Sequence, residues 1–257
     1  MSRWSYSRIT TYEKCPRAYR YKYIDREKEA FESIEAFMGS RVHETIEYLY
    51  GAEGRPVPKD EALKYYATRW DQKWNDRVRV VREGETAAQY LDLGADTVAA
   101  YYPRFVADEL VTRAIEHEVQ MALGGKYEFH GYIDRCARDR DGVPWIIDYK
   151  TGKNAPAEFI GKEADQVRAY GLAMLKSCEH IDTINLRLDF VRAGAVLEGA
   201  IARSDMDKVE RQLVSRIEAA EVQSYSTRVS RLCDWCGYND RCEGPRRAKE
   251  PKGALPF

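Results

Sequence analysis

The sequence predicts an α/β (α+β) domain in which helices flank one central mixed β-sheet. Apolar residues recur at helical spacing through most of the first 111 residues, and from about residue 115 they alternate as in strands. Helical spacing returns at 163–177 and 204–223, on either side of two further strands. With 257 residues, the chain is long enough for one large domain or two small ones with a sizeable core.

Helices are expected first along the chain. Ser5 or Ser7 can cap a first helix, and Pro16 suits the first turn of a second helix through PRAYRYKYI. The segment SIEAFMGSRVHETIEYLYG, residues 33–51, has the apolar spacing of a longer helix. The Gly- and Pro-rich stretch at 51–60 predicts a linker, followed by two more helices at about 60–78 and 86–111.

Strands are expected next. The segments IEHEVQMAL, YEFHGYIDRCARD and VPWIIDYK predict three strands, because GGK and RDRDG between them are good turn sequences. A second strand pair is predicted at 184–191 and 195–202, around the turn RAGA.

The balance of charge excludes a globally basic nucleic-acid-binding protein. Charged residues make up 32% of the chain, and the formal net charge is −1. A polyanion would therefore have to meet a local patch. The first 28 residues offer one, with three acids, interleaved aromatic residues and eight cations: Arg3, Arg8, Lys14, Arg17, Arg20, Lys22, Arg26 and Lys28. The alternative is an ordinary amphipathic helix with a solvated face.

No apolar stretch approaches the length of a membrane span, and the N-terminus lacks the apolar region of a signal peptide. We therefore expect a cytoplasmic protein. In a reducing compartment, we do not expect its six cysteines to form disulfides in the first place.

The segment WIIDYKTG is a buried strand that ends in polar residues. Asp148 and Lys150 lie two apart, so they share one face of the strand, whereas Tyr149 points the other way. Taken alone, the pair could be a solvated salt bridge. Asp134, in GYIDR on the preceding strand, can face Asp148 across the strand pair. Two carboxylates so close repel unless a cation lies between them, and oxygen ligands of this kind suit Mg²⁺ or Mn²⁺.

Two helical pairs complete the pattern. His43 lies one turn before Glu47, and Gln166 and Tyr170 lie four apart in QVRAY. Either pair alone would be a routine helix surface.

Taken in order, GSRVHETIEYL, GYIDR, IIDYKTG and QVRAY resemble the RecB-type branch of the PD-(D/E)XK nuclease superfamily. The resemblance covers nearly the whole chain. It implies a single domain over 1–257 with a restriction-endonuclease-like core, in which 52–112 form a helical insertion.

The same resemblance implies roles for individual residues. His43, Asp134 and Asp148 would bind the catalytic metal, helped by the backbone carbonyl of Tyr149, and Lys150 would act on the attacking water, either as base or by orienting it. Gln166 and Tyr170 would support the site and substrate. Glu118 and Glu47 are candidate acids farther from the metal.

Four cysteines flank this core. Cys233, Cys236 and Cys242 lie in CDWCGYNDRC, and Cys15 lies near the other end of the chain. The pattern is similar to iron–sulfur nucleases such as AddB and the exonucleases of CRISPR adaptation, which implies a [4Fe–4S] cluster joining segments 15 and 233–242. The alternatives are a zinc knuckle or free thiols. Cys136 and Cys178, which fall outside the pattern, are expected to be packed thiols.

The function predicted is a Mg²⁺- or Mn²⁺-dependent DNA exonuclease acting on single strands or ends, with DNA contacts from Arg17, Arg20 and Tyr21. Such an enzyme would serve DNA repair, recombination, phage DNA processing or CRISPR adaptation. The sequence contains no helicase P-loop, so unwinding would need a helicase or another recombination or CRISPR-adaptation partner. The alternatives are a non-catalytic DNA-binding scaffold module and a structure-specific endonuclease.

Overall fold

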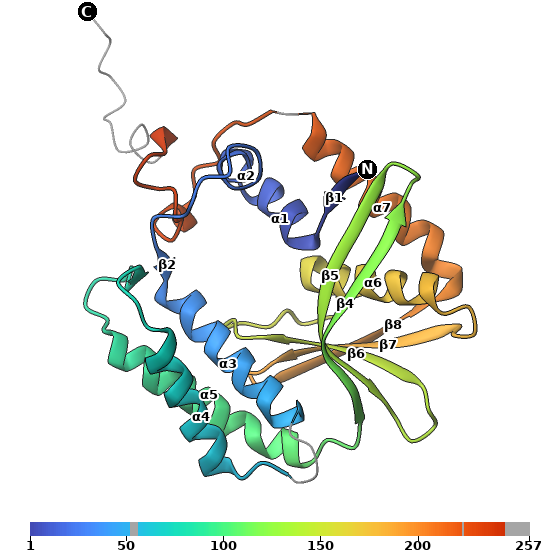
Figure 1. The fold of residues 1–257 in the computed structure, drawn as a ribbon, viewed down its shortest axis with the longest axis horizontal. Helices are drawn as coiled ribbons and strands as arrows, with labels where there is room; N and C mark the ends of the chain where they lie inside the picture. The colour runs from blue at the N-terminus through green and yellow to red at the C-terminus, as the bar shows by residue number, and fades with distance from the viewer. Residues whose placement is uncertain (52–55, 223, 245–257) are drawn as a thin grey trace, which may run out of the picture.

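A computed structural model describes residues 1–51, 56–222 and 224–244. One mixed sheet lies at the centre, with helices on both sides, as the sequence predicts (Figure 1). Its strands are β1 (Ser2–Trp4), β4 (Val111–Leu123), β5 (Tyr127–Arg138), β6 (Pro144–Lys150), β7 (Thr183–Phe190) and β8 (Ala195–Ala202).

The order of the main sheet is β1-β5-β6-β7-β8, and β4 pairs with β5 as well. The β1–β5 and β6–β7 pairs are parallel, and the other pairs are antiparallel. Since β4 follows the whole of one edge of β5, β1 and β6 share the other edge. There β1 pairs with 127–129 and β6 with 135–138. Among the described residues, no strand pairs with 130–134 on that edge, and this gap positions the site.

Helices cover both faces of the sheet (Figure 1). One apolar core contains residues of the sheet together with α6 and α7, and a second core contains residues of α3, α4 and α5. The helices are α1 (Tyr6–Lys14), α2 (Pro16–Tyr19), α3 (Ile34–Gly51), α4 (Lys59–Lys73), α5 (Ala87–Val106), α6 (Gly161–Ser177) and α7 (Met206–Glu221).

Adjacent residues of β6 enter different cores. Ile146 belongs to the core under α6 and α7, whereas Ile147 and Tyr149 belong to the core under α3. This alternation sends Asp148 and Lys150 to the face of Ile146, where α6 lies.

Some predicted boundaries were wrong. The helix expected at 60–78 ends at Lys73, because the chain then turns to form β3 (Val78–Arg79), which pairs with β2 (Glu32–Ser33). The helix expected at 86–111 ends at Val106, and by Val111 the chain is already in β4. The β1 strand was not predicted.

The ends of other helices follow local chemistry. Ser5 caps α1, since its side chain accepts a hydrogen bond from the backbone N–H of Arg8. The helix expected from 204 begins at Met206, after a turn in which Asp205 accepts a hydrogen bond from the backbone N–H of Ala202. Of the predicted linker and insertion, 52–55 lie outside the described residues. No described helix is both long and apolar enough to span a membrane.

Candidate active site

The two predicted acids lie where β5 and β6 separate. The last pair of the ladder here is Arg135 with Ile147, and the next positions in the same register are Asp134 and Asp148. Here a side-chain oxygen takes the place of a backbone acceptor, because the backbone N–H of Tyr149 donates to Asp134 Oδ2 at 2.7 Å. Asp134 is thus fixed directly beside the strand that carries Asp148.

Asp148 and Lys150 form a buried pair, so the sequence's alternative of a solvated salt bridge does not hold. Asp148 is 2% exposed, and Lys150 Nζ lies 2.6 Å from its Oδ2. The contact is an ion pair, and among the described residues Oδ2 has no hydrogen-bond partner. Burial acts to lower the pKa of Lys150, but Asp148, Asp134 and Glu163 together outweigh it and the pKa is raised.

A chain of hydrogen bonds orients Lys150. Its ammonium donates to Gln166 Oε1 at 2.9 Å, and Gln166 Nε2 donates to the Tyr170 hydroxyl at 3.0 Å. The Tyr170 ring lies against Gly131, where an added Cβ would come within 2.5 Å of it. Gly131, the glycine of GYIDR, therefore leaves room for the Tyr170 ring in this series of hydrogen bonds.

The helix α3 approaches the end of β6 at a second glycine. An added Cβ at Gly39 would lie 2.7 Å from Thr151 Oγ1. One turn later, His43 Nδ1 lies 3.6 Å from Asp134 Oδ2. Burial lowers the pKa of His43, so its imidazole is neutral at neutral pH and keeps a lone pair for a ligand.

Acidic side chains crowd this point. Burial and the charge of Asp148 both raise the pKa of Asp134. The same two causes raise the pKa of Glu116, and burial together with Glu116 raises that of Glu47 to about 7. Glu47 was predicted from the sequence together with Glu118, which lies 3.6 Å from Arg3 in an ion pair.

Glu116 was missed because of an irregularity in the strand. Its φ is 48°, in the left-handed region that a Glu rarely adopts. Nearby, the alternation of β5 reverses: Ile133 belongs to the core under α6, yet Ala137, four residues on, belongs to the other core. No sequence pattern signals this reversal.

An open cleft of about 520 Å³ starts at Asp134, Lys150 and Gln166 and runs to α1. Lys14 and Lys162 line it, and among the described residues neither has an ion pair. The other residues that line the cleft are Ser5, Tyr6, Ser7, Thr10, His130, Gly131, Tyr132, Asp134, Lys150, Glu163, Gln166 and Tyr170.

The structure brings the four cysteines together. Cys15, Cys233, Cys236 and Cys242 line one cavity of about 180 Å³, which Lys14 joins to the end of the cleft. Burial and the three neighbouring thiols raise the pKa of Cys236. The two other cysteines are packed as predicted, Cys136 within the core of α6 and α7 and Cys178 against it.

The residues predicted to contact DNA lie near this cavity. Arg17 and Tyr21 line it. Arg20 lies 3.1 Å from Asp25 in an ion pair and faces the ring of Tyr225.

The family comparison agrees with this geometry. The family model of the PD-(D/E)XK nuclease superfamily matches residues 3–243. The chain belongs to this superfamily. Among curated proteins, none matches the sequence significantly.

Two solved structures are similar to this chain over most of its length. One is a protein of Eubacterium rectale provisionally described as an exonuclease, with 10% identity and a TM-score of 0.50, covering 98% of this chain and 90% of that one. The other is SSO0001, with 16% identity and a TM-score of 0.42, covering 94% of this chain and 85% of that one.

Nucleases of this superfamily generally use divalent metals, and the residues present fit one. Among the described residues, the buried Asp148 Oδ2 has no hydrogen-bond partner. The raised pKa of the neighbouring Asp134 means that its charged form is disfavoured. A cation would relieve both conditions. Among the described residues, no three His, Cys, Asp or Glu side chains already converge on one ion position. Lys150 instead occupies the side of Asp148 that faces α6.

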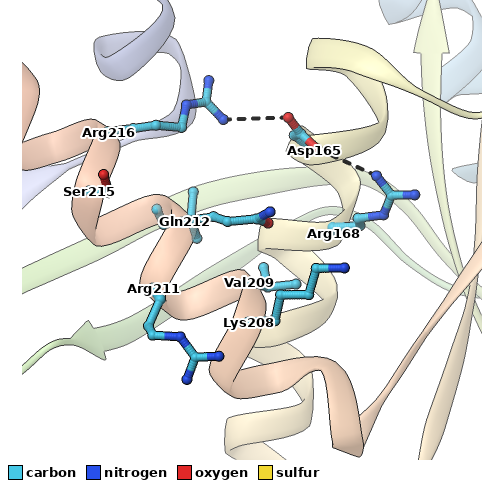
Figure 2. Close-up of a pocket in the computed structure, with 9 residues that line it drawn as sticks. Asp165, Arg168, Lys208, Val209, Arg211, Gln212, Ser215 and Arg216 are labelled. Carbon is cyan, nitrogen blue, oxygen red and sulfur yellow. Dashed lines mark hydrogen bonds and ion pairs between the residues drawn. The ribbon is translucent and has the colours of Figure 1, made fainter.

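A second, basic hollow lies between α6 and α7 (Figure 2). The Arg216 side chain already has partners there, since it forms an ion pair with Glu13 at 2.7 Å and donates a hydrogen bond to the Tyr6 hydroxyl. These contacts tie α1 to α7, and none of the predicted catalytic residues lines this hollow.

Proposed function

We propose that this protein is a Mg²⁺- or Mn²⁺-dependent exonuclease of the RecB-type branch, which hydrolyses phosphodiester bonds of single-stranded DNA or at DNA ends. One observation carries the proposal: His43, Asp134, Asp148 and Lys150 lie together where β5 and β6 separate. Asp134 and Lys150 line a cleft that also holds Lys14 and Lys162, which have no ion pair among the described residues. The fold of the Eubacterium rectale protein, provisionally described as an exonuclease, is consistent with it.

Asp134, Asp148 and His43 would hold the metal, with the backbone carbonyl of Tyr149. When bound, the metal supplies a lowered pKa for water and positive charge for the phosphate oxygens.

Lys150 acts as a donor in this mechanism. Its ammonium group forms an ion pair with the Asp148 carboxylate and donates a hydrogen bond to the Gln166 carbonyl oxygen. Held in this way, Lys150 orients the attacking water and stabilises the negative charge that grows on the phosphate. Water adds to phosphorus, the bond to the leaving oxygen breaks, and one proton passes to solvent.

The deciding experiment uses end-labelled linear single strands, linear duplexes and covalently closed circles, each with Mg²⁺ or Mn²⁺. We expect mononucleotides or short products from linear DNA and none from circles. Cutting of circles would establish the structure-specific endonuclease instead. Binding without any cleavage would establish the scaffold module.

We further propose that Cys15, Cys233, Cys236 and Cys242 hold a [4Fe–4S] cluster. Support comes from the four thiols that surround one cavity, because each cysteine of such a cluster binds a different iron. A zinc ion would instead need its four sulfurs about 2.3 Å from a single point. The cluster would fasten the N-terminal segment to the C-terminal one.

Anaerobically purified protein should be brown and contain iron and sulfide. Cys15→Ser should lose the colour and the iron, whereas Cys178→Ser should keep both. Stoichiometric zinc without iron would refute the cluster, and it would leave the nuclease proposal standing.

A further inference from the structure

Tyr132 differs from the other aromatic residues of the chain. Among the described Phe, Tyr and Trp side chains, only Tyr132 and Trp74 are exposed. Trp74 has aromatic partners, since it stacks on Trp70 and contacts Phe37 edge-on. Tyr132 is 50% exposed, and among the described residues its ring has no aromatic or cationic partner and its hydroxyl no hydrogen bond. A face of this ring is therefore open to a ligand.

The place of Tyr132 indicates what that ligand is. It lies in the gap on the free edge of β5, two residues before Asp134, and it lines the same cleft as Lys150. Two strand residues span about 6.7 Å. Nucleotides stacked in one strand of a duplex rise about 3.4 Å each. The ring is therefore one or two nucleotides from the phosphate that Asp134 and Lys150 would hold.

The cleft has the two features that binding of a single strand needs. Lys14 and Lys162, which have no ion pair among the described residues, can neutralise phosphates. An exposed aromatic ring can stack on a base of any sequence. Base pairs in the interior of a duplex have both faces covered by their neighbours, so they offer no face to Tyr132, whereas an unpaired nucleotide does.

From this placement we propose that Tyr132 stacks on an unpaired base next to the scissile phosphate, and so selects single-stranded DNA or frayed ends. The inference rests on the proposed nuclease function and specifies its substrate. Tyr132 is a specificity-determining residue here, because it contacts a base and takes no part in bond breaking.

The test compares Tyr132→Ala with Tyr132→Phe, which keeps the ring, and Tyr132→Leu, which keeps an apolar side chain without an aromatic face. Binding is measured in the Lys150→Ala background, with single strands that carry the fluorescent base 2-aminopurine at each of the last three positions. A strand that lacks one base at the same positions is the matched control.

We expect Tyr132→Ala to weaken single-strand binding about 5- to 150-fold, the range found when a stacking aromatic ring is removed. Tyr132→Phe should bind like the parent and quench 2-aminopurine at one position, and Tyr132→Leu should not quench it. For the strand that lacks that base, parent and Tyr132→Ala should bind alike. In active protein, Tyr132→Ala should lower the ratio of single-strand to duplex kcat/KM.

Equal binding and equal quenching by parent and Tyr132→Ala would overturn the stacking inference, while cleavage by the unsubstituted protein still upheld the nuclease. A loss in Tyr132→Phe as large as in Tyr132→Ala would also overturn it, because the hydroxyl would then be the contact. If the unsubstituted protein neither bound nor cut DNA, the proposed function would fail first.

Discussion

The catalytic end and the cysteine end of this molecule are held in different ways. Asp134, Asp148 and Lys150 lie on two strands, flanked by α3 and α6, and Asp148 is almost fully buried. The four cysteines come from the short turn before α2 and from a C-terminal segment whose described regular structure is one three-residue turn, Arg231–Cys233. Cys15, Cys233 and Cys236 are only half-buried.

The difference concerns preorganisation. At the catalytic end, the core and the backbone fix the side chains, so the geometry exists without a metal. At the cysteine end, little apolar burial opposes separation of the two segments, and a bound group would have to supply that stability. Substitution of one ligating side chain should therefore abolish cleavage at the first end, and should separate the two terminal segments at the second.

The largest effect is expected from Asp148→Ala and Lys150→Ala. The first removes a proposed metal ligand and the second the group that would orient the water, so cleavage should fall about 100- to 1,000-fold. Asp134→Ala and His43→Ala should behave in the same way. The circular-dichroism spectrum should stay that of the parent, because the core around the site is untouched. Glu179→Ala, at an exposed position, is the control, and full activity in purified Asp148→Ala would refute the site.

The stability of the sheet end can be tested at a buried ion pair next to the site. Arg135 is 1% exposed, and its guanidinium lies 2.6 Å from Asp108. Asp108→Ala leaves the buried guanidinium without its carboxylate partner, which should lower the free energy of unfolding by about 3–5 kcal/mol. Glu109→Ala breaks the exposed pair with Arg140 and should cost at most about 1 kcal/mol. Urea unfolding measures both.

This pair also predicts a dependence on pH. Burial acts to raise the pKa of Asp108, but Arg135 outweighs it and the pKa is lowered. A carboxyl with a lowered pKa stabilises the fold fully above its unfolded pKa of about 3.9, and the contribution is lost as the pH falls through the folded pKa. The difference between the parent and Asp108→Ala should therefore shrink in acid, and a constant difference would contradict the assignment.

Gly131→Ala tests the hydrogen-bond chain that orients Lys150. The new Cβ would displace the Tyr170 ring and, through Gln166, the ammonium group. Displacement by about 1 Å can cost up to about 100-fold in kcat, with little change in KM. Gly51→Ala is the matched control, because nothing lies within 4 Å of a Cβ there. Parental kcat in Gly131→Ala would remove Tyr170 from the mechanism.

At the cysteine end, Cys15→Ser should loosen the termini and change catalysis less. Limited proteolysis should cut near both ends earlier than in the parent, while the cleavage rate falls about tenfold through misplacement of α1 along the cleft. Binding of Mn²⁺ at the catalytic end should be unchanged. Cys178→Ser should show neither effect, and proteolysis of Cys15→Ser at the parental rate would contradict the fastening role.

The smallest effect is expected from the cations beside the cysteine cavity. If Arg17 contacts a phosphate, Arg17→Ala should reduce the slope of log affinity against log salt by about 1. Arg20→Ala should change the slope less, because Asp25 already faces that charge. Lys208→Ala, in the hollow between α6 and α7, should leave the slope unchanged.

Much of the catalytic end could be predicted because its signals are local. Alternation along WIIDYK places Asp148 and Lys150 on one face, and four-residue spacing places Gln166 beside Tyr170. Helical spacing likewise places His43 one turn after Gly39. These relations follow from the geometry of one strand or one helix, whatever the rest of the chain does.

The N-terminal aromatic residues show where such reasoning fails. Their pattern predicted a local patch that a polyanion could meet, yet the rings of Trp4, Tyr6 and Tyr19 are buried in the core. Trp4 and Tyr19 stack on each other, and Arg8 lies over the Trp4 ring at 4.3 Å. The exposed tyrosine is Tyr132, in a strand with no compositional signal of that kind.

The sequence by itself determined the order of the longer helices and strands and, in regular stretches such as β6 and α6, the side on which polar residues lie. Both depend on periods of 3.6 and 2 residues. Only the tertiary structure decided that β1 and β6 leave a gap along β5, that Glu116 adopts a left-handed backbone beside Asp134, and that four distant cysteines share one cavity. Each of these depends on contacts between segments far apart in the chain, where the free energy of packing and not the local pattern selects the conformation.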